Sequence, residues 1–195
     1  MTALRRGLLL VLLVVGFPIL ALTALWAFST YAFRSYEIPA GSMEPTILKG
    51  DHIYVDKATY RRREPRRGEL VVHIIPGEQG RVEKVSRVVA VPGDRVEIQE
   101  KKLLLDGQPQ EEPYAVNLDP YLMPSEMPRD FFGPFVVPPE HYFMLGDNRD
   151  QSLDSRFFGP IERSQITGGP RMWVYWSKDK EKGQIRWDRI GRSLR

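Results

Sequence analysis

The chain of 195 residues contains no cysteine. A disulfide framework, a thiol nucleophile and a cysteine-ligated metal are therefore excluded. A dominant charge of one sign is also lacking, because 28 Lys and Arg face 25 Asp and Glu and leave a net charge of +3. A nucleic-acid-binding domain carries a concentrated basic face, so nucleic acid is not expected as a partner.

Histidine is scarce, and its three copies, His52, His73 and His141, form no metal-binding pattern such as HExxH. No metal and no other cofactor is expected. His73 lies inside a β-branched run, where a histidine of the core or of a strand face is the expected role. A triad of Ser, His and Asp stays open, because its members meet in space rather than in sequence.

The one long apolar run covers residues 7–28, which are 22 residues without a charged side chain. A helix of about 20 apolar residues spans a bilayer, whereas the apolar part of a cleaved signal peptide has about 7–15 residues. Arg5 and Arg6 precede the run, so the positive-inside rule places the N-terminus in the cytoplasm. The sequence thus predicts a cytoplasmic stub and membrane anchor over residues 1–33 and an external domain over residues 34–195.

After the predicted anchor, short β-branched and aromatic runs alternate with Gly and Pro. This pattern is typical of an all-β domain. The runs expected to form strands are residues 70–75, 82–91, 95–98, 103–105, 135–137, 142–145 and 172–176. Residues 108–133 are rich in Pro, Gly and acidic side chains and are expected to form an inserted loop. In the domain after the predicted anchor, helix is expected only as short turns, near residues 162–166.

Ser42 has the sequence context best suited to a nucleophile. It lies in Ile-Pro-Ala-Gly-Ser-Met-Glu-Pro-Thr, residues 38–46. Gly41 permits an unusual backbone conformation and the close approach of a substrate, and the two prolines of the segment stiffen it on either side. For an isolated Gly-Ser pair, an ordinary turn serine would be the better interpretation.

Five sequence boxes, in order, resemble those of the bacterial type I signal peptidases. They are Ser-Met-Glu-Pro-Thr at 42–46, Gly-Asp-His-Ile-Tyr-Val-Asp-Lys at 50–57, Arg-Gly-Glu-Leu-Val-Val at 67–72, Arg-Val-Val-Ala-Val-Pro-Gly-Asp at 87–94 and Gly-Asp-Asn-Arg-Asp-Gln-Ser-Leu-Asp-Ser-Arg at 146–156. Order and spacing agree from the predicted anchor to about Trp176. The resemblance implies a mainly β fold, with an antiparallel sheet or barrel-like catalytic domain behind one N-terminal transmembrane helix.

The resemblance also implies a function and a location. A member of this family is a membrane-bound serine endopeptidase, a hydrolase that removes signal peptides from exported precursor proteins after a small-x-small motif. It implies a single-pass protein of the plasma (inner) membrane, with the catalytic domain on the external or periplasmic side. The expected partners are precursor proteins and the lipid membrane.

The resemblance assigns roles to individual residues. Ser42 would be the nucleophile, with Gly41 and Met43 as supporting residues of its box. A lysine whose pKa is lowered by burial would accept the serine proton.

The box at 146–156 is implied to support that lysine. Ser152 would hydrogen-bond the amine and orient it, and Asp154 and Arg156 would form an ion pair that fixes the box.

The chain departs from the family pattern at the lysine, because Ser86 occupies the position where the family has its lysine. Lys84 lies two residues earlier, and residues i and i−2 of a strand share one face, displaced by about 6.6–6.8 Å. Three interpretations stay open. Lys84 serves as a displaced general base, with a local bulge restoring the register; or Ser86 or a histidine takes over; or the base is absent and the chain binds precursors or assists surface-protein assembly without catalysis.

Overall fold

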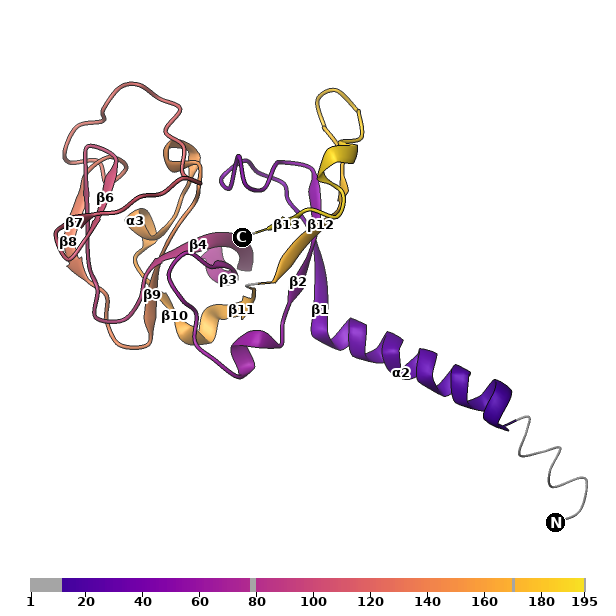
Figure 1. Cartoon of the computed structure of the whole chain (residues 1–195). Helices are drawn as coiled ribbons and strands as arrows, with labels where there is room; N and C mark the ends of the chain where they lie inside the picture. The colour runs from indigo at the N-terminus through magenta and orange to yellow at the C-terminus, as the bar shows by residue number, and fades with distance from the viewer. Residues whose placement is uncertain (1–11, 78–79, 170, 195) are drawn as a thin grey trace, which may run out of the picture.

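The computed structural model of the chain describes residues 12–77, 80–169 and 171–194. It consists of an N-terminal helix that projects from a β-rich body (Figure 1). The strands of the body form three antiparallel sheets. The predicted mainly β, antiparallel fold is therefore confirmed.

The N-terminal helix begins with a π-helical turn, η1 (Leu12–Gly16), and continues as α2 (Phe17–Ala32). Apolar side chains such as Leu20 and Leu25 are exposed along it. Residues 1–11 of the predicted stub and anchor, which include Arg5 and Arg6, lie outside the described residues. In the part of the chain that the structure describes, no helix has both the length and the apolar character needed to cross a membrane.

The first sheet has the strand order β1-β2-β12-β13. Its strand β1 follows α2 without a linker, so the helix is attached directly to the edge of the body (Figure 1). The strands are β1 (Phe33–Glu37), β2 (Asp51–Asp56), β12 (Met172–Ser177) and β13 (Ser193–Leu194). Of these, the sequence predicted only β12, because β1 and β2 carry several charged residues and lack a long β-branched run.

The second sheet has the order β10-β9-β4-β3-β11. Its strands are β3 (Leu70–Gly77), β4 (Gly80–Ala90), β9 (His141–Leu145), β10 (Ile161–Glu162) and β11 (Ile166–Gly168). Strand β3 is buried on both faces, since Val71 and Val72 are both fully buried in separate clusters. That double burial explains why this strand is a continuous apolar run in the sequence.

The third sheet has the order β7-β6-β5-β8. Its strands are β5 (Arg95–Gln99), β6 (Lys102–Leu105), β7 (Gln108–Pro109) and β8 (Phe132–Val136). Two-residue turns join the first three, and both residues of each turn have positive φ: Glu100 and Lys101, then Asp106 and Gly107. Such turns match the right-handed twist of the strands they connect.

In the described residues of the β-rich body, helical structure is limited to single turns. They are η2 (Thr59–Arg61), η3 (Arg149–Gln151), α3 (Ser155–Phe158), η4 (Arg163–Gln165) and η5 (Trp187–Arg189). The helical turn expected near residues 162–166 corresponds to η4. Between β7 and β8 the chain has no helix or strand, apart from one bridge between Val116 and Asn148.

The core that matters for the site lies between the first two sheets. It contains Met43 and Ile47 of the loop between β1 and β2, together with Ile53, Val72 and Val174. The loop that carries the predicted nucleophile is therefore packed onto the sheets by its own apolar side chains. A second cluster lies on the other face of β3, and a third fills the sheet of β5, β6 and β8.

Candidate active site

Ser42 lies in the loop between β1 and β2. Backbone hydrogen bonds close the base of this loop, from Ile38 N to Asp51 O (2.8 Å) and from Gly50 N to Ile38 O (2.9 Å). Ser42 itself is half-buried, whereas its neighbour Met43 is only 2 % exposed and lies in the core. The buried Met43 thus anchors the loop while the adjacent serine stays accessible.

The box at residues 146–156 lies directly against the Ser42 loop. Asn148 donates from its backbone N to Ser42 O (3.1 Å) and from its side-chain Nδ2 to Gly41 O (3.3 Å). A Cβ atom placed on Gly146 would lie 2.5 Å from Ser42 O and 2.2 Å from Ser152 Oγ. Only glycine fits there, and this close approach brings the predicted Ser152 to the nucleophile loop.

A cavity of about 230 Å³ has both Ser42 and Lys84 in its wall. The remaining lining residues are mostly apolar and come from β1, the Ser42 loop, β3 and β4: Tyr36, Glu37, Ile38, Pro39, Ala40, Met43, Val72, Val82, Glu83 and Val85. The structure therefore brings the predicted nucleophile and the candidate displaced base to one small, largely apolar site.

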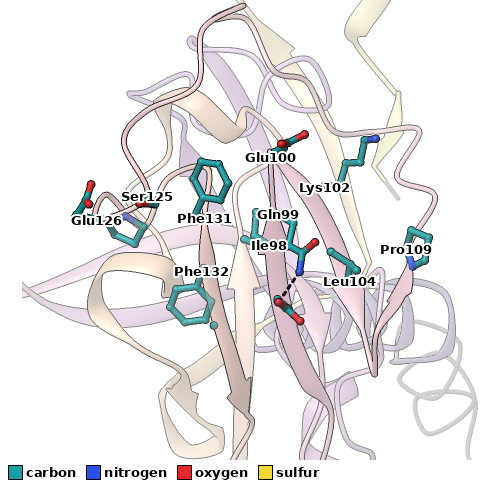
Figure 2. Close-up of a pocket in the computed structure, with 13 residues that line it drawn as sticks. Ile98, Gln99, Glu100, Lys102, Leu104, Pro109, Ser125, Glu126, Phe131 and Phe132 are labelled. Carbon is teal, nitrogen blue, oxygen red and sulfur yellow. Dashed lines mark hydrogen bonds between the residues drawn. The ribbon is translucent and has the colours of Figure 1, made fainter.

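A larger cavity, of about 740 Å³, lies on the third sheet. Figure 2 shows Phe131, Phe132 and Ser125 on one side of it and Leu104 and Pro109 on the other. None of the predicted site residues lines this cavity. Its size does not make it the better candidate, because hydrolysis needs a nucleophile beside a base.

Lys84 shares a strand face with Ser86, as the sequence predicts. In the pairing of β3 with β4, Lys84 lies opposite His73, and Ser86 lies opposite Val71. This register runs without a shift from Leu70 to Gly77, so the bulge considered for restoring the register at Lys84 is absent from this pairing. The register shift in β4 lies further along, against β9, between Val88 and Ala90.

The side chain of Lys84 reaches the box at 146–156. Its amine Nζ donates to the backbone O of Leu153 (2.5 Å), the residue after Ser152, and lies 5.8 Å from the ring centroid of Phe158. Burial lowers the pKa of the Lys84 amine, and the carboxylate of Asp154 partly opposes that shift. The hydrogen bond that the resemblance assigns to Ser152 is thus made by the neighbouring backbone carbonyl.

Ser86 and His73 form a buried pair behind Lys84. Ser86 Oγ lies 3.0 Å from His73 Nε2, and the two residues are 3 % and 0 % exposed. Burial lowers the pKa of the His73 imidazole to about 3, with a smaller contribution from the charge of Lys84. His73 is therefore neutral near pH 7. Sequence reasoning placed it in the core or on a strand face; only the pairing of β3 with β4 reveals that this face also carries Ser86 and Lys84.

The predicted ion pair of Asp154 and Arg156 is present, with 2.8 Å between Asp154 Oδ2 and Arg156 Nη2. Asp154 also accepts from Gly146 N (3.1 Å), and Arg156 donates to the backbone O of Arg149 (2.6 Å). Asp154 and Arg156 are almost completely buried. These contacts close the box on itself and hold Ser152 between them.

A second buried ion pair ties this box to β4 and to the Ser42 loop. Arg87 donates to both oxygens of Asp147 (2.8 and 2.7 Å), and Thr46 Oγ1 donates to Asp147 Oδ2 (2.6 Å). Arg149 pairs instead with Glu112 of the β7–β8 connection, through two contacts of 2.7 Å. Asp147 therefore joins three of the five boxes that the sequence singled out.

We predict that Asp147→Asn lowers the free energy of unfolding by about 3–5 kcal/mol, because it removes one charge of a buried, doubly hydrogen-bonded ion pair. Urea denaturation of the purified protein measures the change. The control is Lys180→Gln, which breaks the ion pair between Lys180 and Glu37. Both side chains of this pair are more than 40 % exposed, so the urea midpoint should stay almost unchanged. Equal midpoints for the two variants would contradict the prediction.

We also predict that His73 makes stability fall in mild acid. The pKa of His73 is lowered on folding from 6.5 to about 3, so between these values the unfolded chain binds a proton that the folded chain does not. Stability contributed by the neutral imidazole is complete above pH 6.5 and declines as the pH falls, by up to about 1.4 kcal/mol per pH unit.

The measurement is the pH dependence of thermal unfolding for the wild type and His73→Leu between pH 7.5 and pH 4.5. The difference in stability between the two proteins at pH 7.5 gives the effect of the substitution on packing. The contribution of His73 titration appears as a smaller loss of stability in the variant as the pH falls. Parallel curves for the two proteins would contradict the prediction.

Comparisons with known proteins agree with the resemblance drawn from the sequence boxes. A family model described as signal peptidase, peptidase S26, matches residues 10–176. A signal peptidase I from Pseudomonas aeruginosa is 30 % identical over an alignment of 218 positions, gaps included, which covers 90 % of this chain and 76 % of that protein. A probable signal peptidase I-2 from Synechocystis is 31 % identical over 71 % of this chain, and the match spans only 62 % of that relative's length.

A crystal structure of a signal peptidase I from Enterococcus faecalis V583 superposes with a TM-score of 0.43 at 25 % identity, over 54 % of this chain and 96 % of that chain. The family model spans all five boxes and most of the chain. The chain therefore belongs to the signal peptidase family, peptidase S26, a family of serine endopeptidases.

Proposed function

We propose that this protein removes signal peptides from exported precursor proteins, with Ser42 as the nucleophile and Lys84 as the general base. The observation that carries this proposal is the cavity of about 230 Å³ whose wall includes both residues. The amine of Lys84 takes the role of the family's lysine from a position two residues earlier on the same strand face.

The reaction follows from the chemistry of the two side chains. The neutral Lys84 amine accepts the proton of the Ser42 hydroxyl as Oγ attacks the scissile carbonyl. The resulting ammonium returns that proton to the leaving amine of the mature protein, and the signal peptide stays bound to Ser42 as an ester. Water, deprotonated by the same amine, then hydrolyses the ester and restores Ser42.

Three features support Lys84 as the base. Its partial burial lowers the pKa of the amine, so a larger fraction is neutral near pH 7. The Leu153 carbonyl accepts one N–H and restricts the orientation of the amine. His73, which lies opposite Lys84 across the strand pair, carries no charge near neutral pH and needs no counter-ion.

The same cavity supports a preference for small side chains at the cleavage site. At about 230 Å³ it is below the usual size of a site for a drug-sized ligand, about 300–1,000 Å³. Its walls include Ile38, Met43, Val72 and Val85, which favour an apolar occupant. Both properties suit a small-x-small motif.

A membrane-bound, single-pass arrangement is part of the proposal, with the N-terminus in the cytoplasm and residues 34–195 outside. Its support is the charge-free run at residues 7–28 behind Arg5 and Arg6 and the direct connection of α2 to β1. Ser42 follows the last residue of α2, Ala32, by ten positions. Even a fully extended segment of that length reaches only about 33–36 Å, so the active site would stay close to the outer membrane surface.

A non-catalytic, precursor-binding protein is the second candidate. One observation favours it: within the described part of the chain, Ser42 Oγ has no hydrogen bond to Lys84 Nζ, whose acceptor is Leu153 O. Catalytic hydrogen bonds often tighten only when substrate is bound, so activity decides between the two candidates.

We predict that Ser42→Ala abolishes cleavage of a precursor peptide containing Ala-x-Ala, and that Lys84→Ala lowers kcat/KM by about 100- to 10,000-fold. For the wild type, kcat/KM should decline as the pH falls through the lowered pKa of Lys84, because only the neutral amine accepts a proton. Mass spectrometry of the products, with the full chain in detergent, measures both effects.

The matched control is Lys182→Ala, which removes an exposed lysine outside the cavity and should keep wild-type turnover. Near-normal cleavage by Lys84→Ala would remove Lys84 as the base. A wild-type protein that binds the precursor peptide but does not cut it would support the non-catalytic candidate.

For the topology, the absence of cysteine makes single introduced cysteines informative. We predict that Lys182→Cys reacts with a membrane-impermeant maleimide in intact cells from which the layers outside the plasma membrane have been removed. Thr2→Cys should react only after lysis. Extraction with alkaline carbonate should leave the protein in the membrane fraction. The reverse labelling pattern, or release by carbonate, would overturn the proposed arrangement.

A further inference from the structure

The His73–Ser86 pair is the feature of the site that the mechanism above does not use. Ser86 stands where the family has its lysine, and its Oγ lies 3.0 Å from His73 Nε2. Both residues are buried and neither lines the cavity that contains Ser42 and Lys84. They lie behind Lys84 on the same face of the β3–β4 pair.

The hydrogen-bond inventory of His73 indicates which ring nitrogen carries the proton. His73 Nδ1 is buried and has no partner among the described residues. A neutral imidazole has one N–H and one bare nitrogen, and a buried N–H without a partner is rarer and more costly than a buried acceptor without one. The proton therefore belongs on Nε2, which donates to Ser86 Oγ.

The groups around His73 favour this uncharged arrangement. Lys84 lies directly opposite on β4, Ile166 lies opposite on β11, and the Phe158 ring lies 6.4 Å from the imidazole, between centroids. The charged groups that act on His73 are Lys84 and Asp154, with the effect of Lys84 the larger. A second cation opposite the Lys84 amine would be unfavourable in this buried setting.

We propose that His73 is a positioning residue for signal-peptide cleavage: its Nε2–H holds the Ser86 hydroxyl on the β4 face, and the pair supports the Lys84 side chain in its approach to Ser42. The proposal rests on the proposed function of Ser42 and Lys84. In the strand register, Lys84 has two neighbours on its face of the sheet. His73 lies opposite it on β3, and Ser86 lies two residues further along β4. Such neighbours on one face of a sheet pack against each other.

The alternative is a proton relay from Ser42 through Ser86 to His73. It requires a bare Nε2 to accept the Ser86 proton and places the hydrogen on Nδ1, where no partner exists among the described residues. It also creates an imidazolium in a position that is 0 % exposed. The geometry favours positioning over a relay for both reasons.

The kinetic test compares His73→Gln with His73→Leu. A glutamine amide can donate to Ser86 Oγ but cannot act as a base, whereas leucine fills the space without a donor. His73→Leu should lower kcat about 10- to 100-fold at nearly constant KM, because the base is misplaced while the substrate site is intact. His73→Gln should keep a kcat much closer to that of the wild type, because its amide can still donate to Ser86 Oγ.

Ser86→Ala removes the other partner of the hydrogen bond. We expect it to lower kcat to a similar extent, and the double variant with His73→Leu should lose no more than either single variant, because both act through one contact. Thermal unfolding of each variant checks that it is folded. If His73→Leu does not fold, Ser86→Ala alone decides whether the hydrogen bond matters for turnover.

Two kinetic outcomes would overturn the proposal. If His73→Gln loses as much activity as Lys84→Ala, His73 is a proton acceptor rather than a positioning residue. If His73→Leu and Ser86→Ala both keep wild-type kcat, the pair has no part in the reaction. Neither outcome affects the proposed cleavage of signal peptides by Ser42, which fails only if Ser42→Ala stays active or if the wild type does not cut.

A second measurement does not depend on activity. Nitrogen-15 NMR of the imidazoles, on the full chain in detergent micelles, distinguishes the two neutral tautomers and the cation. With three histidines in the chain, His73→Gln assigns the signal by its disappearance. We expect a neutral ring protonated at Nε2 from pH 5 to pH 8; a proton on Nδ1, or a cationic ring, would overturn the proposal.

Discussion

The contact between Arg87 and Asp147 is the interaction on which the site depends. The two side chains are 2 % and 0 % exposed, and Arg87 meets the carboxylate with two hydrogen bonds. A buried charge pair persists only when its remaining donors and acceptors are satisfied, and here Thr46 and the Gly68 carbonyl are two of the further partners. Lys84 lies on the strand of Arg87, Ser42 on the loop of Thr46, and Leu153, whose carbonyl accepts from Lys84, in the box of Asp147. One buried contact thus joins the three segments that carry the groups of the proposed mechanism.

Successive side chains of strand β4 point to opposite faces of the sheet, and the two faces have different environments. Arg87 joins the ionic network that holds the loops together, whereas Ser86 and Lys84, on the opposite face, meet the apolar surroundings of His73 and Phe158. Burial deepens along the strand from Lys84, which is half-buried, to Ser86, which is buried. The chain therefore carries its amine nearer the open end of the strand and fills the deeper position with an uncharged pair. An amine at the shallower position pays less desolvation when it becomes charged during the reaction.

Most of the fold could be predicted, and the misses have physical causes. Strands β3, β4, β5, β9 and β12 follow β-branched or aromatic runs, and β6 follows a run of leucines, because their side chains face a core on at least one side. Strands β1 and β2 were missed, although Ile53 and Val55 alternate with polar residues in β2, because the flanking charges masked a short period-two pattern. The possible bulge near Lys84 is not found in the β3–β4 pairing, because the two strands keep one continuous register there.

The sequence alone determined the family and the mainly β class, and it singled out Ser42, Lys84, Ser86 and the box at 146–156 as the candidate residues of the proposed function. These conclusions depend on residue types in a linear order, and linear order is all that a sequence contains. The tertiary structure decided which of those residues meet: Ser42 and Lys84 share a cavity, while Ser86 turns away to His73. No spacing rule links His73 to Ser86 or Thr46 to Asp147. The first contact depends on the register of the adjacent strands β3 and β4, and the second on loop packing between segments far apart in the chain.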